Sequence, residues 1–125
     1  MIKIEDIQKR LREAIEYGEL SQKEIAEREA IYKSSMKQGA TAEAEKNYDD
    51  ALVHYWRASG YCTDASEVHK ALARIYLAKR DFNNARYHYK TAVQKFNLKR
   101  DPDFEEKLIR LAQEVSGQSN SNDSK

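Results

Sequence analysis

The residues of this chain with the strongest chemical potential are three histidines and one cysteine. His54 and His88 occupy equivalent positions in a repeated segment, His69 lies between them, and Cys62 is the single cysteine. Zinc ligands come in pairs only a few residues apart, and no such pair joins these residues. Equivalent positions of stacked repeats are also too far apart to share a metal. We therefore expect no metal site, structural or surface histidines, and an unreactive buried thiol.

Catalytic motifs are missing from the sequence. It contains no GxSxG, GxGxxG, Walker A or HExxH pattern. Adjacent carboxylates occur at 49–50 and 105–106, but charged residues make up 34% of the chain, so these pairs fit solvated helix faces. We therefore expect no enzyme activity and no cofactor.

Length and composition narrow the class of protein further. With 125 residues we expect one domain, and four glycines and one proline disfavour a turn-rich β fold. A net charge of +1 gives no support for nucleic-acid binding. No apolar run approaches the ~20 residues that a membrane span requires, and no basic stretch precedes an apolar one at the start. A lone cysteine forms no internal disulfide, so we expect a reducing, cytoplasmic setting.

An internal repeat is the clearest signal in the chain. The pattern aromatic-x-x-Ala-x-x-His-Tyr-x-x-Ala occurs twice, with 34 residues between equivalent positions. Small residues allow a neighbouring helix to approach closely, and the tyrosine between them fills the space on the same helix face. The two sets are Tyr48, Ala51, His54, Tyr55 and Ala58, and Phe82, Ala85, His88, Tyr89 and Ala92.

The period and pattern resemble the tetratricopeptide repeat (TPR) family, with repeats at 32–65 and 66–99. Leu72, Ala73 and Tyr76 fit the first helix of the second repeat, and Gly39 is the small residue expected in the first. Gln38, Ala42, Thr63 and Asn97 depart from the family pattern. The resemblance implies an all-α fold of antiparallel helical hairpins stacked right-handedly. It also implies a non-catalytic adaptor or scaffold that binds a partner peptide or protein.

Flanking helices should close the stack, because two repeats alone leave apolar faces open. The spacing predicts helices at 4–17 and 22–45, separated at Gly18 and capped by Ser21 with Glu24. One long helix over 4–45 is the alternative. Asp64 is the predicted N-cap of the helix that begins the second repeat, and Asp101-Pro102 opens a last helix at 102–115. We thus expect about six helices in a domain over 1–116, its N-terminal helices within 4–31, and a disordered tail at 117–125.

The resemblance also places candidate binding residues on a concave groove formed by the first helix of each repeat. Lys70 and Arg74 are neighbours on one helix face, where they favour an acidic ligand unless they are ordinary solvated charges. Three positions of the chaperone-type carboxylate clamp carry Met36, Ala40 and Ala71 instead, so we expect no such clamp. The groove positions are Lys33, Met36, Ala40 and Glu43, followed by Glu67, Lys70, Arg74 and Leu77.

Trp56 is a second candidate, because the repeat pattern does not require tryptophan at this position. It is either an exposed anchor for a partner or a residue packed beneath the N-terminal helix. Tyr61 and Tyr87 present the same two alternatives. Self-assembly into a homo-oligomer through the N-terminal helices or these aromatic residues is the alternative function.

Overall fold

A computed structural model describes residues 3–16, 18 and 21–123 of the chain, and within these ranges every regular element is an α-helix. The predicted all-α fold with six helices is therefore confirmed for the described part of the chain. The helices are α1 (Ile4–Glu16), α2 (Gln22–Ala44), α3 (Tyr48–Ser59), α4 (Ser66–Ala78), α5 (Phe82–Phe96) and α6 (Pro102–Asp123).

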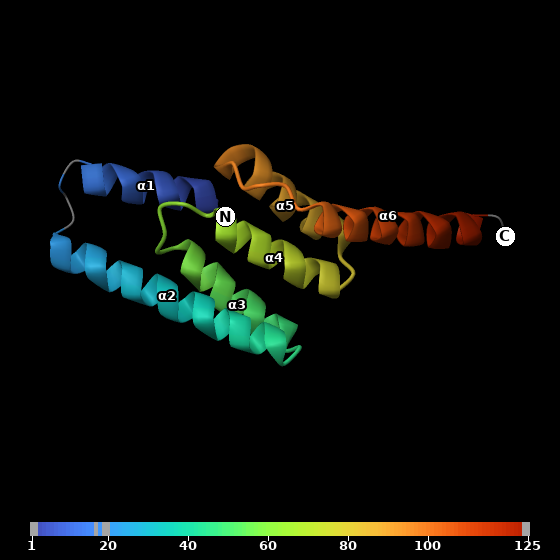
Figure 1. Cartoon of the computed structure of the whole chain (residues 1–125), viewed down its shortest axis with the longest axis horizontal. Helices are drawn as coiled ribbons and strands as arrows, with labels where there is room; N and C mark the ends of the chain where they lie inside the picture. Colours follow the sequence, from blue (N-terminus) through green and yellow to red (C-terminus); the bar gives the residue numbers. More distant parts are fainter. Residues whose placement is uncertain (1–2, 17, 19–20, 124–125) are drawn as a thin grey trace.

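Two antiparallel hairpins form the body of the molecule (Figure 1). Helix α2 packs on α3, α4 packs on α5, and the two hairpins join through α3 and α4. Helix α1 lies near the beginning of α4, and α6 follows α5 and extends past the other helices (Figure 1). The hairpins therefore hold the positions of both terminal helices.

The turns of the two hairpins repeat the 34-residue period in their backbone. Lys46 and Arg80, the equivalent residues of the two turns, both have a φ of 62°. In each turn the next amide donates to a carbonyl near the helix end, from Asn47 to Ala42 and from Asp81 to Tyr76, both at 2.8 Å. These bonds satisfy carbonyls that the helix end leaves free. The sequence repeat is thus a structural repeat.

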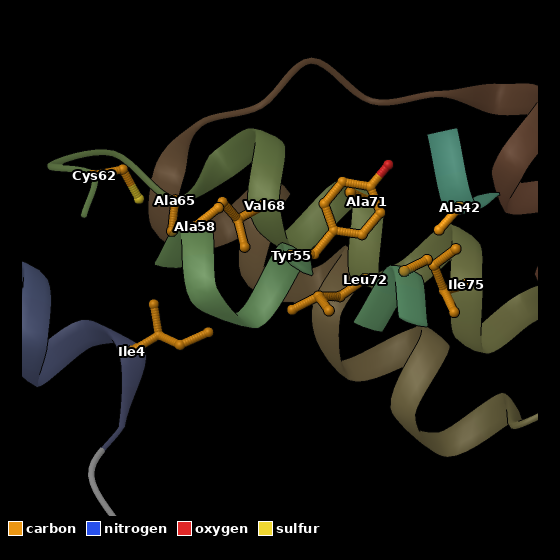
Figure 2. Packing of buried hydrophobic residues seen from close by; sticks show 11 residues of the cluster. Ile4, Ala42, Tyr55, Ala58, Cys62, Ala65, Val68, Ala71, Leu72 and Ile75 are labelled. Atoms are coloured by element: carbon orange, nitrogen blue, oxygen red, sulfur yellow. The ribbon is translucent and has the colours of Figure 1, made fainter. Parts of the chain in front are cut away.

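The predicted small-aromatic-small pattern forms the contact between helices. Ala51, Ala58, Ala85 and Ala92 are fully buried, and Tyr55 is 1% exposed. Figure 2 shows the main core cluster, in which the ring of Tyr55 lies amid the other labelled residues and Ile4 extends from α1 toward them. Burying one such aromatic side chain contributes about 2–3 kcal/mol. The core therefore depends on the residues that the repeat pattern identifies.

The N-terminal segment forms two helices, so one continuous helix over 4–45 is wrong. Gly18 has a φ of +70°, a left-handed conformation that glycine adopts without strain. Ser21 caps α2, because its hydroxyl accepts a hydrogen bond from the amide of Glu24 at 3.2 Å. The glycine turn and the serine cap therefore both lie where the sequence predicts them.

Two predicted helix ends require correction. Ala65, not Asp64, is the N-cap of α4, and the Asp64 carboxylate accepts from the amide of Ser66 at 2.8 Å, across a local turn. At the other end of the chain, α6 continues to Asp123 instead of ending near 115, so it takes in most of the segment predicted as a disordered tail. Neither proline nor a left-handed residue interrupts it. Residues 124–125 lie outside the described part.

Candidate partner-binding site

The predicted groove residues Lys70, Arg74 and Leu77 share one surface hollow of about 470 Å³, which the beginning of α6 closes on one side. The structure thus brings together three of the four second-repeat groove positions, and the fourth, Glu67, lines a different depression. Their participation in partner binding stays a prediction, and the bonds that they already make within the chain bear on it.

Arg74 is paired inside the molecule. Its guanidinium donates to both carboxylate oxygens of Glu43 in α2, at 2.9 and 3.1 Å, and the Tyr55 hydroxyl donates to the same carboxylate at 2.7 Å. Burial raises the pKa of Glu43, but the hydrogen bonds from Arg74 and Tyr55 outweigh it and hold this pKa below its ordinary value. Burial and the same carboxylate raise the pKa of Tyr55 to about 12. Arg74 thus joins the two hairpins.

Lys70 is also paired inside the molecule. Its ammonium lies 2.8 Å from the Asp101 carboxylate, and over the rings of Tyr89 at 5.0 Å and Phe104 at 4.7 Å. Cation–π contacts of this kind stabilise by about 0.5–2 kcal/mol. The lysine therefore anchors the beginning of α6 on α4 and α5. Neither Lys70 nor Arg74 is an ordinary solvated charge, and neither is a free cation.

Of the first-repeat members of the predicted groove, Glu43 contacts Arg74, whereas Lys33 and Met36 lie elsewhere. Met36 is half-buried against the main core cluster. Lys33 is exposed and pairs with Glu29 on the same helix at 3.0 Å. Hence the predicted groove residues do not form one continuous surface. Three of them share the hollow beside α6, Met36 packs against the core, and Lys33 and Glu67 line another depression.

Trp56 is two-fifths exposed, and its indole meets the ring of His88 in α5 edge-on, with centroids 5.6 Å apart. Trp56 thus packs on α5, a helix of the other hairpin. It does not pack beneath the N-terminal helix, which was one of the two alternatives. Tyr87 is also exposed, at 52%. A role of Trp56 as a partner anchor remains a prediction.

The depression that Lys33 borders is the N-terminal groove, which we define as the hollow between α1, the first half of α2 and the loop from α3 to α4. Its volume is about 460 Å³. Ligand sites commonly measure about 300–1,000 Å³ and have mainly apolar walls. Here the apolar side chains are Leu11 and Ile15 of α1, Ile25 and Tyr32 of α2, and Tyr61 of the loop.

Charged side chains border this groove unevenly. The guanidinium of Arg28 lies 5.5 Å from the centre of the Tyr61 ring. Asp64 and Glu67 line the groove near the beginning of α4, and neither forms an ion pair within the described chain. Burial, followed by charge repulsion that includes both carboxylates, raises the pKa of Tyr32. One part of the N-terminal groove is therefore acidic.

A buried polar chain lies on the inner side of α1. Glu5 Oε1 is 3.6 Å from Nε2 of His69 in α4, and Nδ1 of His69 is 2.9 Å from Nδ1 of His88 in α5. Gln8, fully buried on the same face of α1, donates to the Cys62 thiol at 3.4 Å. Glu5 Oε1 and His69 Nε2 form no hydrogen bond in the described residues, so α1 and α4 meet here through a charge contact, and the hydrogen bond between the two histidines joins α4 to α5.

The sequence reading missed both the N-terminal groove and the His69–His88 contact. It compared His54 with His88 across repeats, but the contact joins two helices of the same hairpin. Two histidines at facing positions of a predicted hairpin were the available signal. For the groove the signal was Ile15 and Ile25, apolar residues on either side of the predicted turn at Gly18. His69 and His88 are buried, His54 is half-buried, and Cys62 is a buried free thiol.

The described residues contain no group of three or more His, Cys, Asp or Glu side chains placed to hold a metal ion. Within the same part of the chain, no helix combines the length and apolar character that crossing a membrane requires. Compared with known proteins, the chain matches no family model, no curated protein and no solved structure.

Proposed function

We propose that this protein is a non-catalytic interaction module, similar in plan to TPR adaptors, that binds a short segment of a partner protein in the N-terminal groove. The single observation that carries this proposal is the groove itself: about 460 Å³, with the apolar side chains of α1, α2 and Tyr61 along its walls. This volume fits a few side chains of a peptide.

The charges along the groove specify the chemistry of the partner segment. Lys33 is paired with Glu29, and the Arg28 guanidinium lies over the Tyr61 ring, whereas Asp64 and Glu67 are free of ion pairs in the described chain. A Lys or Arg of the partner would complement these two carboxylates. We therefore propose a segment in which a basic residue stands beside one or more aliphatic or aromatic residues.

This proposal replaces the acidic ligand expected for Lys70 and Arg74. A ligand carboxylate at that hollow would have to displace Asp101 or Glu43, both of which are already in place with good geometry. Such a ligand would compete with carboxylates of the same chain, whose effective concentration is high. Among the described residues, no side chain forms an ion pair with Asp64 or Glu67 in the N-terminal groove.

The test is a selection of short random peptides against the immobilised protein. We expect enriched peptides to carry Lys or Arg next to apolar residues, and to lose at least about tenfold in affinity, ~1.4 kcal/mol, toward the Asp64→Lys/Glu67→Lys variant. Ile25→Glu should weaken them as strongly, because a carboxylate would enter the apolar wall. Binding constants are measured by isothermal titration calorimetry.

The matched control is Glu45→Lys/Asp103→Lys, which makes the same change in net charge at two exposed positions outside the groove. It should bind within about twofold of the original chain. Equal losses of peptide affinity in both double variants would show that the effect depends on net charge alone and not on the groove. Enriched acidic peptides that ignore Ile25→Glu would place the site elsewhere and contradict the proposal.

Self-assembly is the second candidate function, and one observation favours it. On α6, Ile109 is 58% exposed and Val115 is 44% exposed, although the other large apolar residues of the helix, Phe104, Leu108 and Leu111, are buried. Apolar side chains of this size in solvent are typical of contact surfaces. We expect light scattering to show a dimer that Ile109→Glu converts to a monomer. A strict monomer at high protein concentration would contradict self-assembly.

A further inference from the structure

Helix α5 and the loop that follows it carry positive charge without any acidic side chain. Residues 82–100 contain five basic residues and no Asp or Glu, and no other stretch of this length in the chain lacks acidic residues. The net charge of +1 conceals this concentration, because the next segment, 101–114, has five acidic residues against two basic ones. The five basic residues of the stretch are Arg86, Lys90, Lys95, Lys99 and Arg100.

Most of these cations have no partner within the molecule. Arg100 donates to the Glu105 carboxylate at 2.9 Å. The other four, which are all exposed, form no ion pair in the described part of the chain. The two cations of the hollow beside α6 differ in this respect, since each is paired with a carboxylate. The unpaired positive charge of the second repeat therefore lies on α5.

Helical spacing places two of the unpaired cations beside an exposed aromatic ring. Arg86, Tyr87 and Lys90 lie on one face of α5, and the tyrosine is 52% exposed. Asn83 and Gln94 extend the same exposed face by one turn in each direction. We call these five residues the α5 stripe. Tyrosine and arginine are enriched in protein contact surfaces, and this stripe presents both.

The α5 stripe borders a hollow of its own, with a volume of about 340 Å³. Arg86, Lys90 and Gln94 line this hollow, together with the pair of Arg100 and Glu105. Glu105 is the one acidic residue among those that line it, and Arg100 already compensates its charge. Arg86 and Lys90 therefore determine which sign of charge the hollow attracts, and they favour an anionic ligand.

Two classes of macromolecule carry the required negative charge, namely acidic protein segments and nucleic acids. A nucleic acid has a charge on every nucleotide, so it needs cations along an extended track. Here two unpaired cations line the hollow, and the acidic segment 101–114 follows the stretch. A short protein segment with one or two carboxylates matches this pattern better. Arg86 can bind a carboxylate through two hydrogen bonds, and the ring of Tyr87 can cover an apolar neighbour.

We propose that the α5 stripe binds a short acidic protein segment in which Asp or Glu stands beside an aromatic or aliphatic residue. This site is separate from the N-terminal groove, because the two hollows share no lining residue. The inference goes beyond the proposed function and does not depend on it. A module with one site for a basic segment and another for an acidic segment would connect two partner proteins.

The test selects short random peptides on the full chain and measures the acidic members of the enriched set by fluorescence anisotropy. We expect acidic peptides with an aromatic or aliphatic residue to be enriched. Their affinity should fall by at least about tenfold toward Arg86→Glu/Lys90→Glu, because two attractive charges become repulsive. Tyr87→Ala should weaken the same peptides by about three- to tenfold, since it removes only the ring contact.

Two controls separate the α5 stripe from net charge and from the N-terminal groove. Lys23→Glu/Lys37→Glu makes the same change in net charge at two exposed positions of α2, a helix of the other hairpin, and should bind the acidic peptides within about twofold of the original chain. Ile25→Glu should leave their affinity unchanged, so failure of the groove and failure of the stripe give different results. Circular dichroism verifies the fold of each variant. If the double glutamate variant does not fold, Arg86→Gln/Lys90→Gln should still weaken binding at least about threefold.

Three results would overturn the proposal. The first is a selection that enriches no acidic peptide. The second is an equal loss of affinity in the α5 and α2 double variants, which would leave no role for the position of the charges. The third is tighter binding of a labelled oligouridylate of about 12 nucleotides than of every acidic peptide, with this binding lost in Arg86→Glu/Lys90→Glu. That last result would identify the stripe as a nucleic-acid surface.

Discussion

Replacing Gly39 with alanine should destabilise the protein by about 1–2 kcal/mol, although the same change in most helices is stabilising. A Cβ at position 39 would lie 2.6 Å from the nearest ring atom of Tyr55. Overpacking of this kind costs about 1–3 kcal/mol, against a gain in helix propensity of up to about 1 kcal/mol. The ring has little room to retreat, because it is buried and its hydroxyl is bonded to Glu43. Urea denaturation measures the difference.

Gly117→Ala is the matched control, because apart from the adjacent residues and backbone of α6 itself, no described heavy atom lies within 4 Å of the added Cβ. It should leave stability unchanged or raise it by up to about 1 kcal/mol. A second control places Gly39→Ala in a Tyr55→Leu background, where the cost of the alanine should largely disappear. If Gly39→Ala were as harmless as Gly117→Ala, the close packing of α2 on α3 would be refuted.

Stability should also fall by about 3 kcal/mol between pH 7 and pH 4 through His88 alone. Its pKa is about 4 in the folded chain, against an ordinary value of 6.5. Because the unfolded chain takes up the proton first, this contribution is complete above about pH 6.5 and is lost as the pH falls toward 4. The lowered pKa of His69 acts in the same direction. Urea denaturation at a series of pH values measures the slope.

The histidine effect has its own pH window. Glu43, Asp101 and Glu105 have lowered pKa values, so the stability that they provide is lost only below about pH 4.5. The comparison is therefore made between about pH 7 and pH 5. His88→Phe, which keeps an aromatic ring among Trp56 and Tyr76, should flatten the slope in this window. An equally steep slope in the variant would show that His88 is not its source.

The hairpins could be predicted from the sequence because their determinants are local. The Ala-x-x-x-Tyr-x-x-Ala spacing defines one helix face. Ser21 and Asp101 mark helix starts because their side chains accept from nearby amides, and Gly18 marks a helix end through its positive φ. The N-terminal groove and the ion pairs were not predictable in this way. Glu43 and Arg74 are 31 residues apart, and the charges of Lys70 and Asp101 are equally distant in sequence. Such partners are set by how the hairpins pack.

Gln8 illustrates the same limit. The apolar spacing over 4–17 predicts the helix, but it does not predict a buried glutamine. In the structure Gln8 is fully buried and Ile15 is 37% exposed in the groove. Helix α1 covers two polar side chains, Cys62 and His69, and this explains why a glutamine lies on its buried face. These neighbours are known only once α1 is placed against α4.

The measurement that tests the account most directly is a two-dimensional NMR titration of the protein with the most strongly enriched peptide. If the N-terminal groove is the binding site, the largest amide shift changes will fall on Ile15, Ile25, Tyr61 and Asp64, and those of Lys70, Arg74 and Leu77 will stay small. Shift changes concentrated on Lys70, Arg74 and Leu77 would contradict the account and return the site to the hollow beside α6.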